Sequence, residues 1–318
     1  MIFRTQIPVP KSNFPIDYNS KIVSFGSCFA ENIAQKFDYF KFHNAVNPFG
    51  IIFNAIAIER IVERIVNQEL FTEKDIFYHN DLWHCFEVHS ELSHPNKAEF
   101  LKNLNNLLIF SISQIAKLSH CVITYGTSWV YRNIENNQVV ANCHKVPQKH
   151  FTKELLSLEA TQKSIESTIS LIHSVNKNVK FIFTVSPVRH IKDGFVENNI
   201  SKSVLLQSVY QIIHSENLKL NCEYFCSYEI ILDELRDYRF FKPDMLHPNE
   251  IAIDFVWQKF VESIISEYSY SMMNEVENIQ KMISHKSLNS QSIKNQEFKT
   301  KLQAKITDFQ ARNPQIIF

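Results

Sequence analysis

Short apolar runs alternate with amphipathic stretches along the first 265 residues. The runs at 21–25, 121–125 and 179–185 are rich in β-branched and aromatic residues and end in polar or glycine-containing turns, which predicts buried strands. Shorter strands are expected near 40–46 and 222–227. Apolar positions spaced as on one helix face predict helices from residue 28 onwards, after residue 50, and at about 97–117, 152–175, 199–216 and 248–265. This alternation favours an α/β fold with a parallel sheet and helices on both faces.

Two segments interrupt the alternation. Residues 69–95 are expected to form an insertion of short extended pieces. Residues 129–144 alternate like a hairpin around Asn136 and Asn137, a pair that tolerates the positive φ angles of a two-residue turn. Pairing outward from this turn predicts that Trp129 lies opposite His144 and Ser128 opposite Lys145.

The composition changes after residue 265. The last segment, 266–318, is polar and charged with sparse apolar positions. We expect a polar helical tail of one or two exposed helices, with a Ser/Asn-rich joint at 287–292, packed on a partner or on the surface of the domain at 1–265.

The chain has 33 basic and 33 acidic residues and is 45% hydrophobic, which excludes a disordered chain and a polybasic nucleic-acid binder. No apolar run reaches the roughly 18 to 20 residues of a membrane helix, and the first residues do not resemble a signal peptide. We therefore expect a cytoplasmic protein without nucleic-acid or membrane partners. The six cysteines contain no CxxC pair, and on a strand at 82–89 His84 and His89 would face opposite sides, so no metal site is predicted.

In a parallel sheet, ligands bind at the carboxyl ends of the strands, so residues that follow strands are the candidates for chemistry. Asp244 lies three residues before His247, and Pro248 follows at the start of a predicted helix. Asp244 can therefore orient the imidazole through its Nδ1 proton, which is the arrangement of a general base. The alternative is that Asp244 caps the helix and His247 is a surface residue.

A second candidate is the turn Gly26-Ser27-Cys28, between the first strand and the first helix. A side chain on such a bend is exposed, and the free amides of the helix N-terminus can hold a developing oxyanion. The alternative is a simple tight turn. A nucleophile here would work with a base from the other end of the domain.

The chain also resembles a known family through six ordered sequence blocks between about residues 20 and 265. They are SFGSCFAENI (24–33), NPFG (47–50), YGTSWVYR (125–132), NCHK (142–145), SPVRH followed by DG (186–190, 193–194) and DMLHPN (244–249). These blocks resemble the GSCFA-domain family, which is similar to the SGNH, or GDSL-like, hydrolases. The resemblance implies a flavodoxin-like three-layer fold over 1–265 and a hydrolase of acyl esters.

The SGNH pattern, carried over by position, implies roles for individual residues. Aligned on Gly26, Cys28 takes the nucleophile position; Ser27 would serve if the turn is shifted by one residue. A helix N-terminus and a histidine base are expected to lower the pKa of the Cys28 thiol. Gly50 matches an oxyanion donor of the family. The asparagine of the third block is missing here, so the set that could replace it is Thr127, Ser128, Asn47 and Asn142.

Further candidates would bind the substrate. The predicted hairpin register brings His144 and Lys145 towards the pocket, where they would suit an anionic or polyhydroxyl group; the alternative is an exposed cross-strand pair. Arg189 and His190 follow a strand, and the guanidinium could clamp a carboxylate or phosphate. The alternative there is a salt bridge to Asp193 or Glu197.

Together these residues predict acyl transfer to water. His247, oriented by Asp244, would deprotonate Cys28 or Ser27, which attacks a small-molecule or saccharide-linked acyl ester, without a cofactor. Two alternatives stay open: an acyltransferase that uses the same site, and a non-catalytic binding module of hydrolase ancestry.

Overall fold

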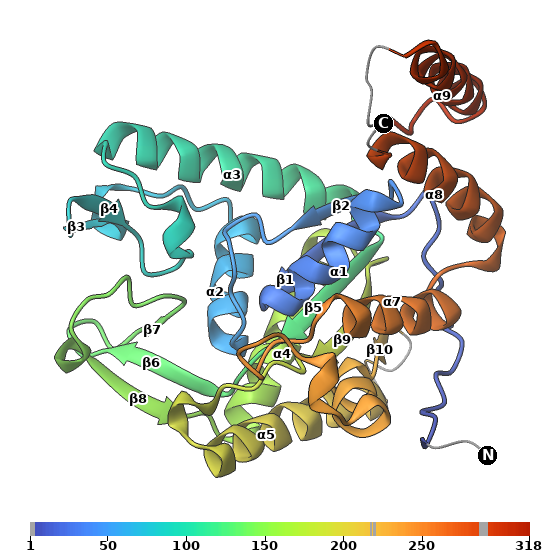
Figure 1. The fold of residues 1–318 in the computed structure, drawn as a ribbon. Coiled ribbons are helices and arrows are strands. Elements are labelled where there is room, and N and C mark those ends of the chain that lie inside the picture. Colours follow the sequence, from blue (N-terminus) through green and yellow to red (C-terminus); the bar gives the residue numbers. More distant parts are fainter. Residues whose placement is uncertain (1–3, 217, 219–220, 286–291) are drawn as a thin grey trace.

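The computed structural model describes residues 4–216, 218, 221–285 and 292–318. Its centre is a five-stranded parallel sheet in the order β10-β9-β5-β1-β2 (Figure 1). The strands are β1 (Lys21–Gly26), β2 (His43–Val46), β5 (His120–Tyr125), β9 (Lys180–Val185) and β10 (Cys222–Tyr224). Numbered within this sheet, the order is 2-1-3-4-5, which is the flavodoxin-like order, so the α/β prediction is confirmed.

Helices cover both faces of the sheet (Figure 1). Four pack on one face: α2 (Ala55–Val66), α3 (Lys97–Lys117), α4 (Leu158–Val175) and α5 (Phe195–His214). The other face is covered by α1 (Cys28–Tyr39) and α7 (Glu250–Ile264). The shorter helices are α6 (Ser227–Glu229), the π-helix η5 (Ile230–Leu235), and the 3₁₀ turns η1 (Glu73–Asp75), η2 (Ser90–Leu92), η3 (Gln148–His150), η4 (Ile191–Asp193), η6 (Tyr238–Phe240) and η7 (Glu267–Ser269).

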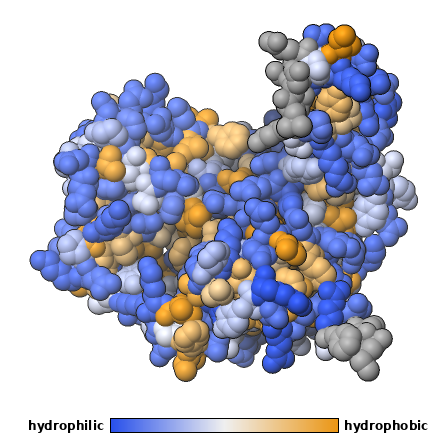
Figure 2. All heavy atoms as spheres, viewed as in Figure 1, coloured by the Kyte–Doolittle hydropathy of each residue, from blue (hydrophilic) through white to orange (hydrophobic). Residues whose placement is uncertain are grey.

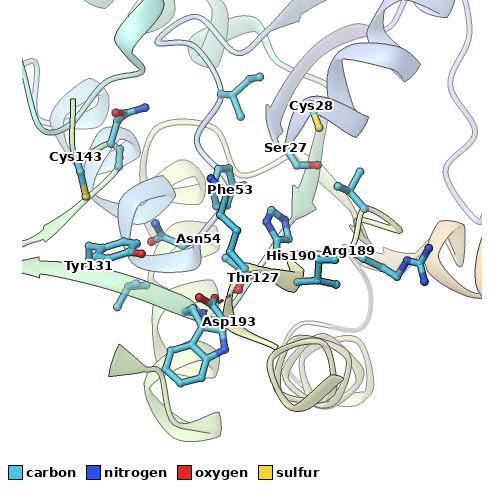
Figure 3. A pocket seen from close by; sticks show the side chains of 18 of the residues that line it. Ser27, Cys28, Phe53, Asn54, Thr127, Tyr131, Cys143, Arg189, His190 and Asp193 are labelled. Carbon is cyan, nitrogen blue, oxygen red and sulfur yellow. Dashed lines mark hydrogen bonds between the residues drawn. The ribbon is translucent and has the colours of Figure 1, made fainter. Parts of the chain in front are cut away.

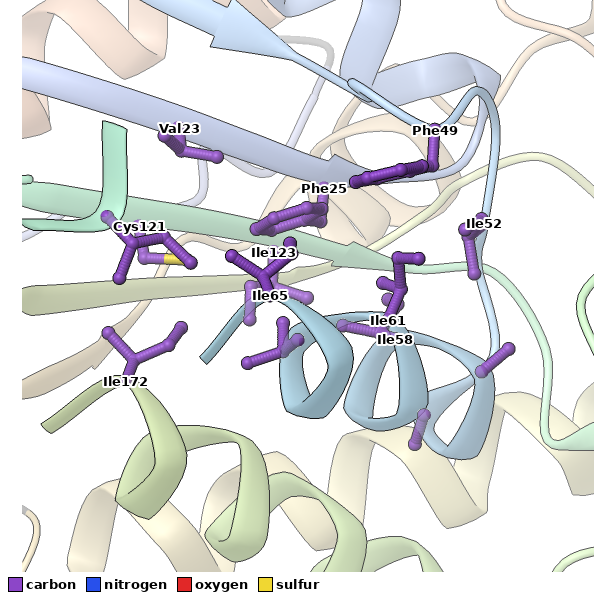
Figure 4. Packing of buried hydrophobic residues seen from close by; sticks show 14 of the residues in the cluster. Val23, Phe25, Phe49, Ile52, Ile58, Ile61, Ile65, Cys121, Ile123 and Ile172 are labelled. Atoms are coloured by element: carbon purple, nitrogen blue, oxygen red, sulfur yellow. The ribbon is translucent and has the colours of Figure 1, made fainter. Parts of the chain in front are cut away.

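Alternation along the strands divides the core into two clusters, because successive side chains of a strand point to opposite faces. Phe25 and Ile123 pack against Ile58 of α2 on one face (Figure 4). Ile22 and Val122 belong to the cluster on the other face. Both faces are buried, which explains the continuous apolar runs in the sequence.

Two small antiparallel sheets lie beside the main one (Figure 1). The insertion contributes β3 (Phe77–His79) and β4 (Leu82–His84), and a three-stranded sheet is formed by β6 (Trp129–Asn133), β7 (Val139–Val140) and β8 (Phe151–Leu155) in the order β7-β6-β8.

The predicted hairpin register was wrong. Tyr131 pairs with Val140, and Trp129 lies opposite Leu155 of β8, not opposite His144. The hairpin ends early because the amide of Ala141 donates to the carbonyl of Phe86 in the insertion. β8 pairs with the other edge of β6, so the start of the helix predicted at about 152 is a strand, and α4 begins only at Leu158.

The last segment contains α8 (Tyr270–Ser284) and α9 (Ile293–Arg312). α8 is packed rather than exposed, because Met273, Val276 and Ile279 are buried in the cluster shared with α1 and α7. Most of the predicted joint at 287–292 lies outside the described residues. Figure 2 shows hydrophilic side chains over most of the viewed face, with hydrophobic ones in small separate groups. Within the described residues, no helix is both long and apolar enough to span a bilayer.

Candidate active site

A pocket of about 500 Å³ opens at the carboxyl edge of the parallel sheet (Figure 3). Its lining comes from the turns after β1, β5 and β9, from the loop before α7 and from the three-stranded sheet. β1 and β5 are adjacent strands whose connections leave in opposite directions along the sheet, which is the position where flavodoxin-like folds bind ligands. Apolar side chains form much of the wall, among them Ile51, Phe53, Val130, Val140, Val188 and Leu246.

The turn after β1 presents Ser27 and Cys28 to this pocket. Gly26 has φ +141°, and a Cβ there would lie 2.2 Å from the carbonyl oxygen of Thr124, so the bend requires glycine. Ser27 is the N-cap of α1: its Oγ accepts from the amide of Phe29 at 3.2 Å, and the residue is only 2% exposed. Cys28 is the first helical residue and is half-buried.

The pKa of the Cys28 thiol is raised, contrary to the expectation from its helix N-terminus. Burial is the main cause, and the nearby charge of Glu31 adds to it. The amides of Cys28 and Phe29 and the ammonium of Lys242 act in the opposite direction but are weaker. The thiol is therefore protonated at rest and needs a base before it can act as a nucleophile.

His247 and Asp244 form the expected pair. His247 Nδ1 lies 2.6 Å from Asp244 Oδ2, and Asp244 Oδ1 accepts the amides of Leu246 and His247 at 2.9 and 3.0 Å. These hydrogen bonds hold the pKa of Asp244 well below its usual range, so the carboxylate stays ionised beside the imidazole. The alternative role as the cap of α7 does not hold, because Asn249 caps that helix.

The two ends of the domain meet in this pocket. His247 and Leu246 line it together with Ser27 and Cys28. The charge of Lys242, whose amide donates to the carbonyl of His247, also reaches Cys28. The loop before α7 and the turn after β1 therefore border the same pocket.

Arg189 lines the pocket, but its guanidinium is engaged. Nη2 donates to the carbonyl of Met245, and the group lies 5.2 Å and 4.9 Å from the ring centres of Tyr238 and Phe241. Neither of the salt bridges considered from the sequence forms; Asp193 instead pairs with Lys153. Arg189 thus holds the loop that carries His247.

Gly50 and Asn47 do not line the pocket. The amide of Gly50 donates to the carbonyl of Asn47 at 2.7 Å and closes a turn. The side chain of Asn47 accepts a hydrogen bond from the amide of Gly26 and donates one to Glu31, so it stabilises the turn at 26–28. In this arrangement neither residue offers a donor to a ligand.

Thr127 and Ser128 follow β5, and only Thr127 lines the pocket. Ser128 is fully buried, and its Oγ donates to the carbonyl of Ser201 on α5 at 3.0 Å. The Oγ of Ser201 accepts from the amide of Ser128 and lies 2.8 Å from the Oγ of Thr127. This loop is therefore fixed to α5 and does not supply an oxyanion donor from Ser128.

His144 and Lys145 do not reach the pocket, unlike Asn142. Both have positive φ, and the turn directs the His144 ring into the insertion, where Nε2 bonds the carbonyl of Cys85 at 2.7 Å. His79, His84 and His144 form a histidine cluster there, with ring centres 6.4 Å (His79–His84) and 4.7 Å (His84–His144) apart. No group of three His, Cys, Asp or Glu side chains in the described part of the chain is arranged to hold a metal ion.

His190 lies in the pocket, with its ring stacked on Phe53 at 5.4 Å between centres (Figure 3). Its backbone amide donates to Asn198 Oδ1 at 2.8 Å. Burial, with smaller effects from the charges of Lys202, His247 and Lys192, lowers the pKa of His190 to about 3. The imidazole is neutral at any ordinary pH.

Sequence reasoning missed Lys202. This lysine of α5 is buried, and its Nζ donates to the carbonyls of Gly126 and Ser186 at 2.6 Å each, which ties the ends of β5 and β9 together. Burial lowers the pKa of Lys202 to about 7, and the charge of Cys28 has a smaller, opposite effect. Its position three residues before Leu205, on the buried stripe of α5, was the signal available in the sequence.

Comparison with known proteins gives a family match and matches among the solved structures. A crystal structure of a carbohydrate esterase family 3 protein from Talaromyces cellulolyticus is similar at 9% identity and a TM-score of 0.36, covering 81% of this chain and 99% of that one. None of the curated proteins matches the chain. The family model of GSCFA covers residues 21–260, from the first strand to the last helix of the sheet domain. The protein belongs to the GSCFA family.

Proposed function

We propose that the protein hydrolyses carboxylic esters, with Cys28 as the nucleophile and His247 as the base. The observation that carries this proposal is that Cys28 and an Asp244-oriented His247 line one pocket, although they are 219 positions apart in the chain. The apolar wall of that pocket suits the acyl group of an ester, and the open side leaves room for a small-molecule or saccharide alcohol.

The reaction follows from the positions of these groups. His247 takes the thiol proton as Cys28 attacks the ester carbonyl, and the tetrahedral intermediate then expels the alcohol, which takes that proton from His247. Water, deprotonated by His247, attacks the thioester and releases the carboxylic acid, and the proton returns to Cys28. Asp244 stays ionised and stabilises the imidazolium in both halves of the reaction.

Ser27 remains the alternative nucleophile. It lines the same pocket, but its Oγ already accepts a hydrogen bond as the N-cap of α1 and is more buried than Cys28. A thiol whose pKa is raised by burial also depends on a base, which gives His247 a necessary role in either case.

Hydrolysis of p-nitrophenyl acetate and butyrate tests the proposal. We expect His247→Ala and Cys28→Ala each to lower kcat on the order of 10⁴-fold, with Ser27→Ala much milder. The matched control is His214→Ala, which removes an exposed histidine at the other end of α5 and should leave the rate unchanged. Loss with Ser27→Ala but not with Cys28→Ala would move the nucleophile to Ser27.

Two outcomes would reject hydrolysis. A burst of one p-nitrophenol per chain, followed by turnover only when an alcohol or amine acceptor is added, would identify an acyltransferase. A wild-type protein that neither turns over nor forms an acyl adduct would identify a binding module, an outcome that the engaged Gly50 and Ser128 donors make worth testing.

A further inference from the structure

Three of the oxyanion donors that the sequence blocks suggest are engaged or lie outside the pocket, whereas Thr127 and Asn142 line it. The Gly50 amide is used inside a turn, Ser128 is bonded to α5, and Asn47 lies outside the pocket. An ester hydrolase needs hydrogen-bond donors aimed at the oxygen that becomes negative, and the loss of one costs roughly 10² to 10³ in kcat. A residue of the pocket lining with an unpartnered polar atom is therefore of interest.

His190 is such a residue. Its Nε2 is buried and has no hydrogen-bond partner among the described residues. In Figure 3 its ring lies between Phe53 and the Ser27–Cys28 turn, and all four residues line the pocket. Stacking on Phe53 and the hydrogen bond from the His190 amide to Asn198 fix the ring without using its nitrogens. An unpartnered buried polar atom is costly, and a ligand that pairs with it recovers that cost.

Burial, with a smaller contribution from nearby charges, keeps the His190 ring neutral. The titratable groups whose positive charge disfavours an imidazolium at His190 are Lys202 from α5, His247 from the loop before α7, and Lys192 from η4. Burial and these charges both disfavour an imidazolium, so the ring cannot serve as an acid or a base near neutral pH. It still carries one N–H, and positive charge on Lys202 and Lys192 favours a negative oxygen beside it.

We propose that His190 is a catalytic residue that donates a ring N–H to the oxyanion formed when the nucleophile attacks the ester. The inference rests on the proposed hydrolase function and adds an oxyanion donor to it. His190 lies in the SPVRH block, after β9. It would thus replace the third-block asparagine, whose place in the chain is after β5.

Two substitutions separate donation from shape. His190→Phe keeps an aromatic ring against Phe53 and removes the N–H, and His190→Gln places an amide N–H near the position of Nε2. With p-nitrophenyl acetate we expect His190→Phe to lower kcat by roughly 10² to 10³ with little change in KM, and His190→Gln to recover most of that loss.

Alkylation of Cys28 by iodoacetamide supplies a readout that a structural role would move. This displacement forms no oxyanion, so its rate, measured by mass spectrometry of the Cys28 peptide, should be the same in His190→Phe and wild type. A parallel fall in alkylation would show that His190 only shapes the turn, and it would overturn the proposal.

The remaining outcomes are also decisive. If His190→Phe keeps kcat within about threefold of an active wild type, His190 is not an oxyanion donor and the hydrolase proposal stands without it. If His190→Gln is as slow as His190→Phe while both keep the wild-type melting temperature, donation is rejected. A wild type without esterase activity removes the proposed function and this inference with it.

Discussion

Two histidines near the edge of the sheet differ in what their burial does. His144 of the histidine cluster and His190 of the pocket are both neutral, because burial lowers the pKa of His144 to about 4 and that of His190 to about 3. Nε2 of His144 forms a hydrogen bond with the carbonyl of Cys85, within the insertion. His190 lines the pocket, and its buried Nε2 has no hydrogen-bond partner in the part of the chain that the structure describes. The pair teaches that burial makes a histidine neutral, and that pocket access and a free nitrogen make it a candidate for function.

The largest effect on kcat should come from a substitution in the pocket, at Asp244. In Asp244→Asn the amide cannot hold the imidazolium as the carboxylate does, so kcat for p-nitrophenyl acetate should fall on the order of 10⁴-fold. The melting temperature should stay close to that of wild type, because the side chains of Asp244 and His247 are 44% and 40% exposed. An unchanged kcat would remove Asp244 from the mechanism.

The histidine cluster should instead affect the free energy of unfolding at low pH. His144 takes up a proton near pH 6.5 in the unfolded chain but only at about pH 4 in the folded protein. The free energy of unfolding therefore falls as the pH drops through this window. The difference of about 2.5 pKa units corresponds to roughly 3 kcal/mol. His144→Gln should lose about that much less unfolding free energy between pH 7 and pH 4, measured by urea denaturation, and should keep esterase activity. Equal acid losses in the two proteins would contradict this assignment.

Arg189 offers an intermediate effect, through the position of the loop before α7. Arg189→Met removes the donor to the carbonyl of Met245 and should displace His247, which we expect to cost roughly 10- to 100-fold in kcat. Arg189→Lys should restore part of the rate, and Arg239→Met, which alters another arginine of the neighbouring 238–240 turn, is the control. A rise in KM for anionic esters alone would instead favour an anion clamp.

Ser128 should give the smallest effect. Ser128→Ala removes a buried hydrogen bond to Ser201, so the unfolding free energy should fall by about 1 kcal/mol. The rate of ester hydrolysis should stay within about twofold of wild type. A loss of 10² or more in kcat would return Ser128 to the oxyanion site.

The sequence predicted the parallel sheet well because its strands are buried on both faces. Runs such as 121–125 and 179–185 can only be strands in that setting, and their ends locate the candidate chemistry. The Asp244–His247 pair was visible because both members lie in one loop.

What could not be predicted depends on contacts between distant residues. Ser128 is unavailable because Ser201, 73 positions later, bonds it, and β8 is a strand because β6 has a free edge beside it. Burial raises the pKa of the Cys28 thiol and outweighs the opposite effect of the amides at the helix N-terminus. None of these outcomes leaves a local pattern in the chain.

The pocket is bordered by two sheets that share no strand. The five-stranded sheet carries Ser27 and Cys28 on its edge, while Trp129 and Tyr131 stand on the separate sheet formed by β6, β7 and β8. The groups proposed for bond breaking and the surface that would select an acyl chain thus belong to separate hydrogen-bonded sheets. Substitutions on β6 are therefore expected to change the preferred ester more than the hydrogen bonds around Cys28.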